Sequence, residues 1–147
     1  MIKGLSFKIL NEQGKYLFDI LESISITKYN WQCIDAEVYD NRYENLFNKD
    51  TISGEELNRI ISKQNYYIVN IQLEAYKKIE DRKEIKLYTD FIKSDCEIML
   101  CIYDSEFCEI YFKNEEVLNK EYKILEEKNF NPVYITEKNI RERISIF

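Results

Sequence analysis

Two carboxylates, Asp35 and Glu37, have the spacing best suited to chemistry in this sequence. They lie two residues apart in a stretch of alternating polarity, so on a β-strand they share one side at a separation of about 6.5 to 7 Å. At that separation two carboxylates could share a cation or divide the roles of general acid and general base. The polar residues predicted to join them are Asn70, Gln72, Glu74 and Glu109. The alternative is that all of these are ordinary solvated side chains on an exposed sheet face.

Large aromatic side chains are predicted on the same side of the strands. The set is Tyr29, Trp31, Tyr39, Tyr76, Tyr103 and Tyr111. Such rings combine apolar area with a polar group, so together they would form a contact surface for a protein partner or a sugar. The alternative is that they pack against each other across strands, or lie beneath the polar segment 40–51.

Several classes of active site are excluded by composition. The chain has no histidine, which removes Ser-His-Asp, Cys-His and histidine-metal sites, and three glycines are too few for a phosphate-binding or dinucleotide-binding loop. The cysteines at 33, 96, 101 and 108 match no zinc-binding spacing, so we expect free thiols. We therefore predict no catalytic residues, no metal site and no cofactor.

The predicted face depends on the register of a hairpin over residues 97–113. A two-residue turn at Asp104 and Ser105 would place Glu97 among apolar neighbours. A three-residue loop from Asp104 to Glu106 instead makes one face wholly apolar, with Ile98 opposite Phe112, Leu100 opposite Ile110 and Ile102 opposite Cys108. We favour the three-residue loop, although it puts Asp104 or Ser105 where glycine is the usual residue.

The remaining elements follow from hydrophobic periodicity. Alternation predicts strands over 2–10, 29–39, 66–77, 132–136 and 140–147, and helical spacing predicts helices over 12–25, 53–65, 89–93 and 114–129. In the strand over 29–39, Ile34, Ala36 and Val38 are expected to face inward. The expected helix N-caps are Asn11, Ser53 and Asn114, with Ser53 and Glu56 forming a capping box.

Each predicted helix has one apolar stripe, and each long strand has one apolar face. This combination is typical of an α+β two-layer sandwich, a mainly antiparallel sheet with helices packed on one face and the other face open. A chain of 147 residues can bury one core without disulfides or metals, so we expect a single domain over 1–147.

Charge and hydropathy limit the environment and the partners. The formal charge of −6 argues against nucleic-acid binding and favours a basic protein partner. No apolar run approaches the length needed to cross a bilayer, and the N-terminus has no leader pattern. We expect a soluble cytoplasmic protein that does not bind membranes.

Short motifs connect the chain to a known family. They are Gly4-Leu5-Ser6-Phe7, Tyr29-Asn30-Trp31, Asn65-Tyr66-Tyr67 and Ser94-Asp95-Cys96. Together they resemble a family of small uncharacterised bacterial proteins that is classed as a domain of unknown function. The resemblance covers nearly the whole chain and implies a bacterial cytoplasmic protein, but it carries no catalytic or binding residues across.

Three hypotheses for function remain. The leading one is a non-enzymatic protein-interaction module, by analogy an acidic immunity-like inhibitor of a basic partner. Its predicted binding residues are Tyr29, Trp31, Asp35, Glu37, Tyr39, Gln72, Glu74, Tyr76, Glu109 and Tyr111. The second is a carboxylate-dependent hydrolase or metal-binding protein that uses the same open face. The third is a homodimer formed through that face.

Overall fold

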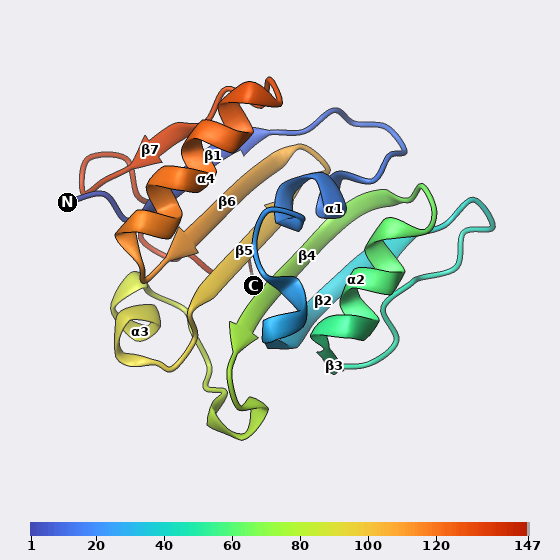
Figure 1. The fold of residues 1–147 in the computed structure, drawn as a ribbon, viewed down its shortest axis with the longest axis horizontal. Helices are drawn as coiled ribbons and strands as arrows, with labels where there is room; N and C mark the ends of the chain where they lie inside the picture. The colour runs from blue at the N-terminus through green and yellow to red at the C-terminus, as the bar shows by residue number, and fades with distance from the viewer. Residues whose placement is uncertain (147) are drawn as a thin grey trace.

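The computed structural model describes residues 1–146, in which seven strands form one antiparallel sheet (Figure 1). The strand order is β3-β2-β4-β5-β6-β1-β7. The strands are β1 (Gly4–Lys8), β2 (Asn30–Tyr39), β3 (Thr51–Ser53), β4 (Tyr67–Tyr76), β5 (Ile98–Tyr103), β6 (Phe107–Phe112) and β7 (Val133–Ile135). The helices are α1 (Tyr16–Leu21), α2 (Gly54–Ser62), α3 (Tyr88–Lys93) and α4 (Glu115–Glu127), with short 3-10 turns η1 (Ile26–Lys28) and η2 (Ile79–Asp81).

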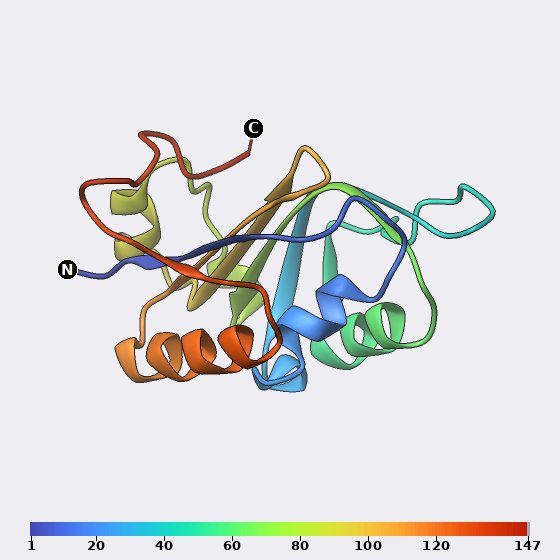
Figure 2. The ribbon, with the colours of Figure 1, turned by 90° about the horizontal axis from the view of Figure 1, so that it is seen from above.

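Helices α1, α2 and α4 cover one face of the sheet, here called the first face (Figure 2). Their buried side chains, Leu17, Ile20, Leu57, Ile61, Leu118 and Leu125 among them, form one apolar core with strand residues such as Leu5, Leu73, Leu100 and Ile110. The α+β class with an antiparallel sheet is therefore confirmed.

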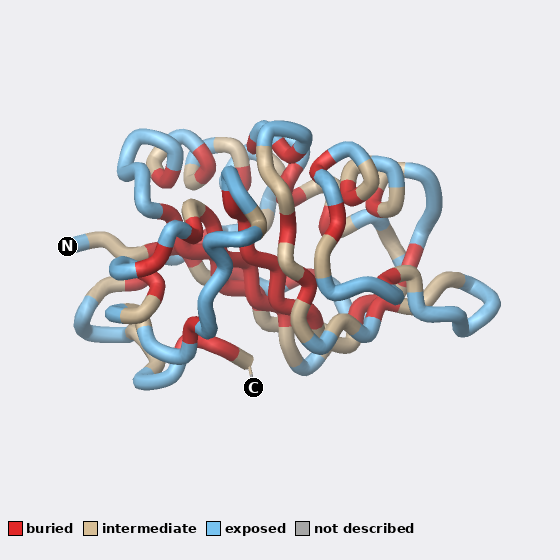
Figure 3. Tube along the Cα trace, turned by 90° about the horizontal axis from the view of Figure 1, so that it is seen from below, coloured by how far each residue is buried: buried red, intermediate tan, exposed pale blue. Residues whose placement is uncertain are grey.

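The opposite face of the sheet is here called the second face. It was expected to be open, but it is largely covered. Helix α3 and the C-terminal segment, residues 136–146, lie over it (Figure 2). Figure 3 shows buried stretches in this segment close to the chain end, and Ile144 and Phe91 are both fully buried. A second cluster therefore packs here, joining Phe91 and Ile144 to Tyr76, Met99 and Tyr111 of the sheet.

The central hairpin has the predicted register. Ile98 pairs with Phe112, Leu100 with Ile110 and Ile102 with Cys108, and these six side chains lie in the core of the first face. Asp104 and Ser105 both take left-handed backbone angles, with φ of 52° and 61°. A three-residue loop without glycine is therefore accommodated by Asp and Ser, of which Asp is one of the residues that tolerate this conformation best.

Two helix starts are as predicted and one is not. Ser53 Oγ accepts from the Glu56 amide at 3.1 Å, and Asn114 Oδ1 accepts from the Val117 amide at 3.1 Å. The helix expected over 12–25 with Asn11 as cap is wrong, because α1 spans only Tyr16–Leu21. Gly14 exchanges backbone hydrogen bonds with Tyr66 at 3.1 and 2.9 Å, which holds the chain before α1 extended.

The orientation predicted for strand β2 is wrong in its first half. Trp31 and Cys33 are buried in the first-face core, while Ala36 and Val38 also face that core as expected. A single alternation cannot place both pairs on one side, since odd and even positions point oppositely. The strand contains a β-bulge after Ile34, where Asp35 has φ of 46°, and this extra residue reverses the alternation.

Two further expectations concern the C-terminus and the cysteines. No strand forms in residues 140–146, so that prediction is wrong there, and position 147 lies outside the described residues. All four cysteines are buried and free as predicted, and Cys101 and Cys108 lie on opposite sides of the sheet. Within residues 1–146, every helix is too short or too polar to span a bilayer.

Replacing Gly54 with alanine should destabilise the fold. A Cβ at this position would lie 2.2 Å from the Ile26 carbonyl oxygen and 2.7 Å from that of Tyr29, both backbone atoms that cannot move independently. We expect Gly54→Ala to lower the free energy of unfolding in urea by about 1 to 3 kcal/mol. The control is Gly14→Ala, whose nearest contact is the half-buried Tyr16 ring at 2.8 Å and can shift. Equal losses for the two variants would contradict this explanation.

Candidate functional site

The ten residues predicted to form one binding face are divided by the structure into three groups. Trp31 lies on the first face, where it is 0% exposed and its indole nitrogen donates to the Ile26 carbonyl at 3.0 Å. Tyr29 is half-buried, with its ring edge against Trp31. The bulge in β2 explains this displacement, because it turns the first half of the strand the other way.

Five of the ten residues are buried on the second face. They are Gln72, Glu74, Tyr76, Glu109 and Tyr111, none of which is more than 7% exposed. Their predicted orientation is right, but the prediction that this side is open is wrong. The reason is that α3 and the C-terminal segment bring Phe91 and Ile144 over them.

The remaining three residues, Asp35, Glu37 and Tyr39, lie at the surface beyond the covered part of the sheet. Asp35 and Glu37 are exposed and Tyr39 is half-buried. The Tyr39 hydroxyl donates to Glu37 Oε2 at 3.3 Å. The bulge separates Asp35 from Glu37 in the ladder, so this pair does not meet Glu74 or Glu109 in one site.

Glu109 on β6 is neutralised by an arginine that the sequence gave no reason to select. Arg141 binds both of its carboxylate oxygens, with N–O distances between 2.8 and 3.0 Å. The hydroxyls of Tyr103 and Tyr111 donate to the same carboxylate at 2.9 and 2.7 Å. Burial, followed by this hydrogen bond, raises the pKa of Tyr103 to about 12. The carboxylate is therefore fully occupied within the fold.

Glu74 on β4 is the more unusual carboxyl. It is 0% exposed, and it accepts hydrogen bonds from Gln72 Nε2 at 2.7 Å and from the Tyr76 hydroxyl at 2.9 Å. Burial raises its pKa, while these two donors act in the opposite direction. No cation in residues 1–146 pairs with it, so its charged form is poorly stabilised.

Neither Glu74 nor Glu109 has a geometry that directly supports catalysis or metal binding. In the part of the chain that the structure describes, no three His, Cys, Asp or Glu side chains are placed to hold a metal ion. Burial also raises the pKa of the Cys101 thiol well above its ordinary value, with Glu109 as the next cause. Cys101 is therefore a poor nucleophile.

A surface feature that the sequence analysis missed lies next to Asp35 and Glu37. The chain after β2, residues 40–47, projects past the end of the sheet (Figures 1 and 2). Tyr43 at its tip is 87% exposed. Phe47 is buried in the core of the first face and anchors this segment. The sequence did carry a signal for the turn: an aspartate, Asp40, followed by polar residues favours a turn closed by its own side chain.

The chain matches a family model and a bacterial relative over most of its length. Residues 2–145 match the family described as "Protein of unknown function (DUF2691)". A similar protein is the uncharacterized protein YncE of Bacillus subtilis (strain 168), which is 30% identical over 148 aligned positions covering 95% of each chain. No solved structure gave a significant match. The resemblance identified from the short sequence motifs is thereby confirmed.

Removing Arg141 should destabilise the fold by leaving Glu109 buried without its cation. We expect Arg141→Gln to lower the free energy of unfolding by about 3 kcal/mol in urea at pH 7. Arg59→Gln is the control, because Arg59 is exposed and lies 3.9 Å from half-buried Glu56, and it should cost less than about 1 kcal/mol. The double variant Arg141→Gln, Glu109→Gln should recover part of the loss. Similar losses for Arg141→Gln and Arg59→Gln would contradict the role of the buried pair.

Glu74 should make stability depend on pH in a defined direction. Its pKa is raised above the ordinary 4.5, so above pH 4.5 the folded state retains a proton that the unfolded state releases. The contribution of Glu74 to the free energy of unfolding is fully present below pH 4.5 and is lost as the pH rises through its raised pKa. Glu74→Gln should therefore increase the free energy of unfolding at pH 7 relative to wild type, with the difference shrinking towards pH 4. Glu80→Gln, an exposed control, should leave the curve unchanged. Parallel pH curves for Glu74→Gln and wild type would exclude this role of Glu74.

Proposed function

We propose a function from one premise: the chain belongs to the DUF2691 family of proteins of unknown function. Because that family supplies no activity, the proposal comes from the molecular surface. We propose that the protein is a non-enzymatic interaction module that binds a basic protein. The binding surface, here called the acidic surface, is formed by Asp35, Glu37, Tyr39, Asp40, Tyr43 and Glu44.

The exposed side chain of Tyr43 is the observation that carries this proposal. It is 87% exposed, and its backbone has a φ of 64°, a left-handed conformation that costs free energy for a residue with a large side chain. Exposed tyrosines held in a fixed position are common centres of protein interfaces, since they bury much area on binding and lose little conformational entropy.

The turn that holds Tyr43 is fixed by its own hydrogen bonds. Asp40 Oδ1 accepts from the amides of Arg42 at 2.8 Å and Glu44 at 3.1 Å, and the Asp40 carbonyl accepts from the Tyr43 amide at 3.0 Å. The amide of Asp40 in turn donates to the Glu44 carbonyl at 3.0 Å. A surface ordered before binding has a smaller entropic cost of association than a mobile loop.

The same segment is tied to the sheet beside it. Asn45 Nδ2 donates to the Ala36 carbonyl at 2.7 Å, and its Oδ1 accepts from the Phe47 amide at 3.1 Å. These bonds hold the turn next to the exposed end of β2, where Glu37 and Tyr39 lie. The two parts of the acidic surface are therefore contiguous.

Charge supports a basic partner. Residues 35–45 contain four carboxylates and one arginine, Arg42, so this surface is strongly negative within a chain whose formal charge is −6. A partner with complementary charge would associate faster, and its binding would weaken as salt increases. A basic toxin or enzyme held in an inactive complex is the partner class that this chemistry suits.

The two other hypotheses receive less support. The hydrolase or metal hypothesis started from the Asp35 and Glu37 pair, joined by Glu74 and Glu109 on one open face. Glu74 and Glu109 are instead buried and hydrogen-bonded within the fold, apart from that exposed pair. A homodimer through the second face would require α3 and the C-terminal segment to move away. Self-association through the acidic surface would bring like charges together, which is unfavourable.

Tyr43→Ala should abolish most of the binding. A photo-crosslinking amino acid at the neighbouring exposed position 41, introduced in the native bacterium, would identify the protein that contacts this surface while leaving Tyr43 in place. With that protein purified, we expect Tyr43→Ala to weaken binding by about 2 kcal/mol, roughly thirtyfold, as for an interface hot spot. Val133→Ala, an exposed apolar position elsewhere on the molecule, is the matched control and should change binding little.

A charge variant tests the electrostatic part of the proposal. Glu44→Gln should weaken binding at low salt, with a smaller effect at high salt, whereas Glu115→Gln at the exposed start of α4 should not. Sedimentation at several concentrations would separate a heterologous partner from self-association. A crosslinked partner that is acidic, or unchanged affinity in Tyr43→Ala, would disprove the proposed function.

A further inference from the structure

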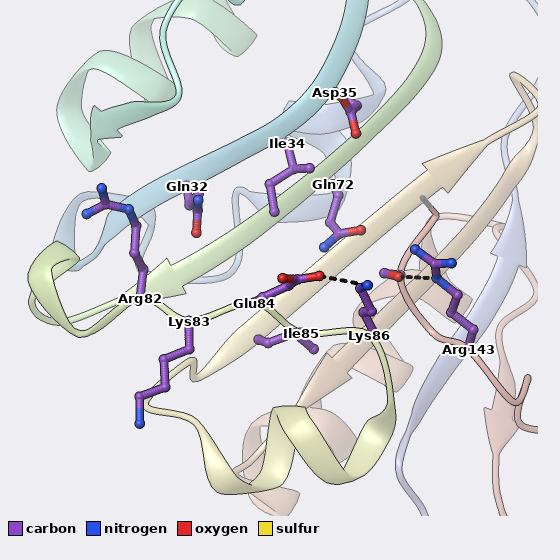
Figure 4. Close-up of a pocket in the computed structure, with 11 residues that line it drawn as sticks. Gln32, Ile34, Asp35, Gln72, Arg82, Lys83, Glu84, Ile85, Lys86 and Arg143 are labelled. Atoms are coloured by element: carbon purple, nitrogen blue, oxygen red, sulfur yellow. Dashed lines mark hydrogen bonds and ion pairs between the residues drawn. The ribbon is translucent and has the colours of Figure 1, made fainter.

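A pocket of about 580 Å³ lies on the second face, between strands β2 and β4, the segment 82–86 and the C-terminal segment (Figure 4). This volume is within the range of small-molecule binding sites. Its lining residues are Gln32, Ile34, Asp35, Gln72, Arg82, Lys83, Glu84, Ile85, Lys86, Arg143 and Ser145. Four cationic side chains and two carboxylates line this pocket, so its net charge is positive, whereas that of the acidic surface is negative.

Two of these cations converge at one end of the pocket. In Figure 4 the polar ends of Lys86 and Arg143 turn towards each other and towards Gln72, whereas Arg82 and Lys83 extend away. Arg143 uses Nε to donate to Ser145 Oγ at 3.0 Å, a bond that orients its guanidinium group. A planar guanidinium beside an ammonium group is a suitable arrangement for an oxyanion such as a carboxylate or phosphate.

The residues around these cations are held in place by the fold. The backbone carbonyl of Lys86 accepts from the amides of Ile144 at 2.9 Å and Ser145 at 3.3 Å, which joins the two segments that supply the cations. Gln72 is fixed on both sides, because its Oε1 accepts from the Ile146 amide at 3.1 Å and its Nε2 donates to Glu74. Buried Glu74 therefore sets the orientation of one wall of the pocket.

The rest of the pocket suits an uncharged body. Ile34 and Ile85 provide apolar area, and Ile34 faces this side only because of the bulge in β2. The amide of Gln32 lines the pocket, and no described residue hydrogen-bonds its side chain, so it is available to a polar group of a ligand.

We propose that this pocket binds a small molecule that carries a carboxylate or phosphate group. The oxyanion is held by Lys86 and Arg143, and the uncharged remainder lies over Ile34 beside the amides of Gln32 and Gln72. This site differs from the acidic surface in ligand class, although Asp35 borders both.

Glu84 is the internal competitor for Lys86. Its Oε1 lies 3.0 Å from Lys86 Nζ, but both side chains are more than half exposed, so this ion pair is weak and an incoming oxyanion can replace it. Because the whole chain is negative, general electrostatic attraction would not concentrate anions here. Binding of an anion would therefore report a local site.

The experiment is a titration of the full chain with inorganic phosphate and with citrate, followed by backbone amide NMR shifts. We expect saturable shifts confined to residues 83–86, 143–146 and the neighbouring strand positions 32–34 and 72, weaker at high salt. A response to only one probe would support the site and identify its preferred oxyanion. The absence of saturable shifts with both probes would overturn the proposal.

Variants distinguish this site from unspecific charge effects. Lys86→Gln and Arg143→Gln should each weaken binding roughly tenfold, since each removes a charged hydrogen bond to the ligand. Lys83→Gln, which removes the same charge from a side chain that extends away, and Arg59→Gln on α2 should stay within about twofold of wild type. Equal weakening by all four variants would overturn the proposal.

A structural failure of one variant leaves the test decisive. If Arg143→Gln loosens the C-terminal segment, Lys86→Gln alone decides, because the backbone of Lys86 rather than its side chain holds that segment. Retained affinity in Lys86→Gln would overturn the assignment. None of these substitutions touches Tyr43 or Glu44, so the proposed function and the pocket fail or succeed separately.

Discussion

The ion pair between half-buried Arg141 and buried Glu109 is the interaction on which the second face depends. It fixes the C-terminal segment to the middle of the sheet, and the same arginine also donates to the Ile144 carbonyl at 2.8 Å. With this segment in place, Ile144 covers Met99, Cys101 and Tyr111, and the main chain at 144–146 reaches Lys86 and Gln72. The exclusion of solvent from Glu74 and the position of the pocket walls both follow from the placement of this segment. A buried pair of this kind need not add net stability, but it requires both partners to remain.

The bulge at Asp35 is the second constraint, because it reverses the alternation of β2 between its first and second halves. The half that contains Trp31 and Cys33 completes the core under α2, and the half that contains Ala36 and Val38 continues it. Between them, Ile34 is turned to the pocket while Asp35 is exposed beside it. The bulge therefore lies where the cationic pocket and the acidic surface meet on β2, with Asp35 bordering both. These two surfaces have opposite charge and so suit different ligands.

Features fixed by residues close in sequence were predictable. The hairpin register followed from the polarity of its two strands, because a slip of one residue would have turned Ile98, Leu100 and Ile110 away from the helices. The caps at Ser53 and Asn114 depend on a side chain and an amide three residues apart. The number and spacing of the cysteines likewise predicted that all four would be free. The groups that form the hairpin and the helix caps lie within a short stretch of sequence, so a local pattern is enough to identify them.

Only the tertiary structure decided which predicted residues remain accessible. Alternation placed Ala36 and Val38 of β2 correctly but Trp31 and Cys33 on the wrong side, because it could not reveal the bulge, which depends on pairing with β4. The cover of the second face was equally invisible, because the alternation over 140–147 predicted only a strand, whereas the segment acts through contacts such as Ile146 with Gln72, 74 positions apart. Composition and local pattern thus determined the α+β class, the register of the central hairpin and the helix starts at Ser53 and Asn114. Long-range packing alone decided that Glu74 and Glu109 are buried and that Tyr43 and the pocket face solvent, because burial depends on what the rest of the chain places over a residue.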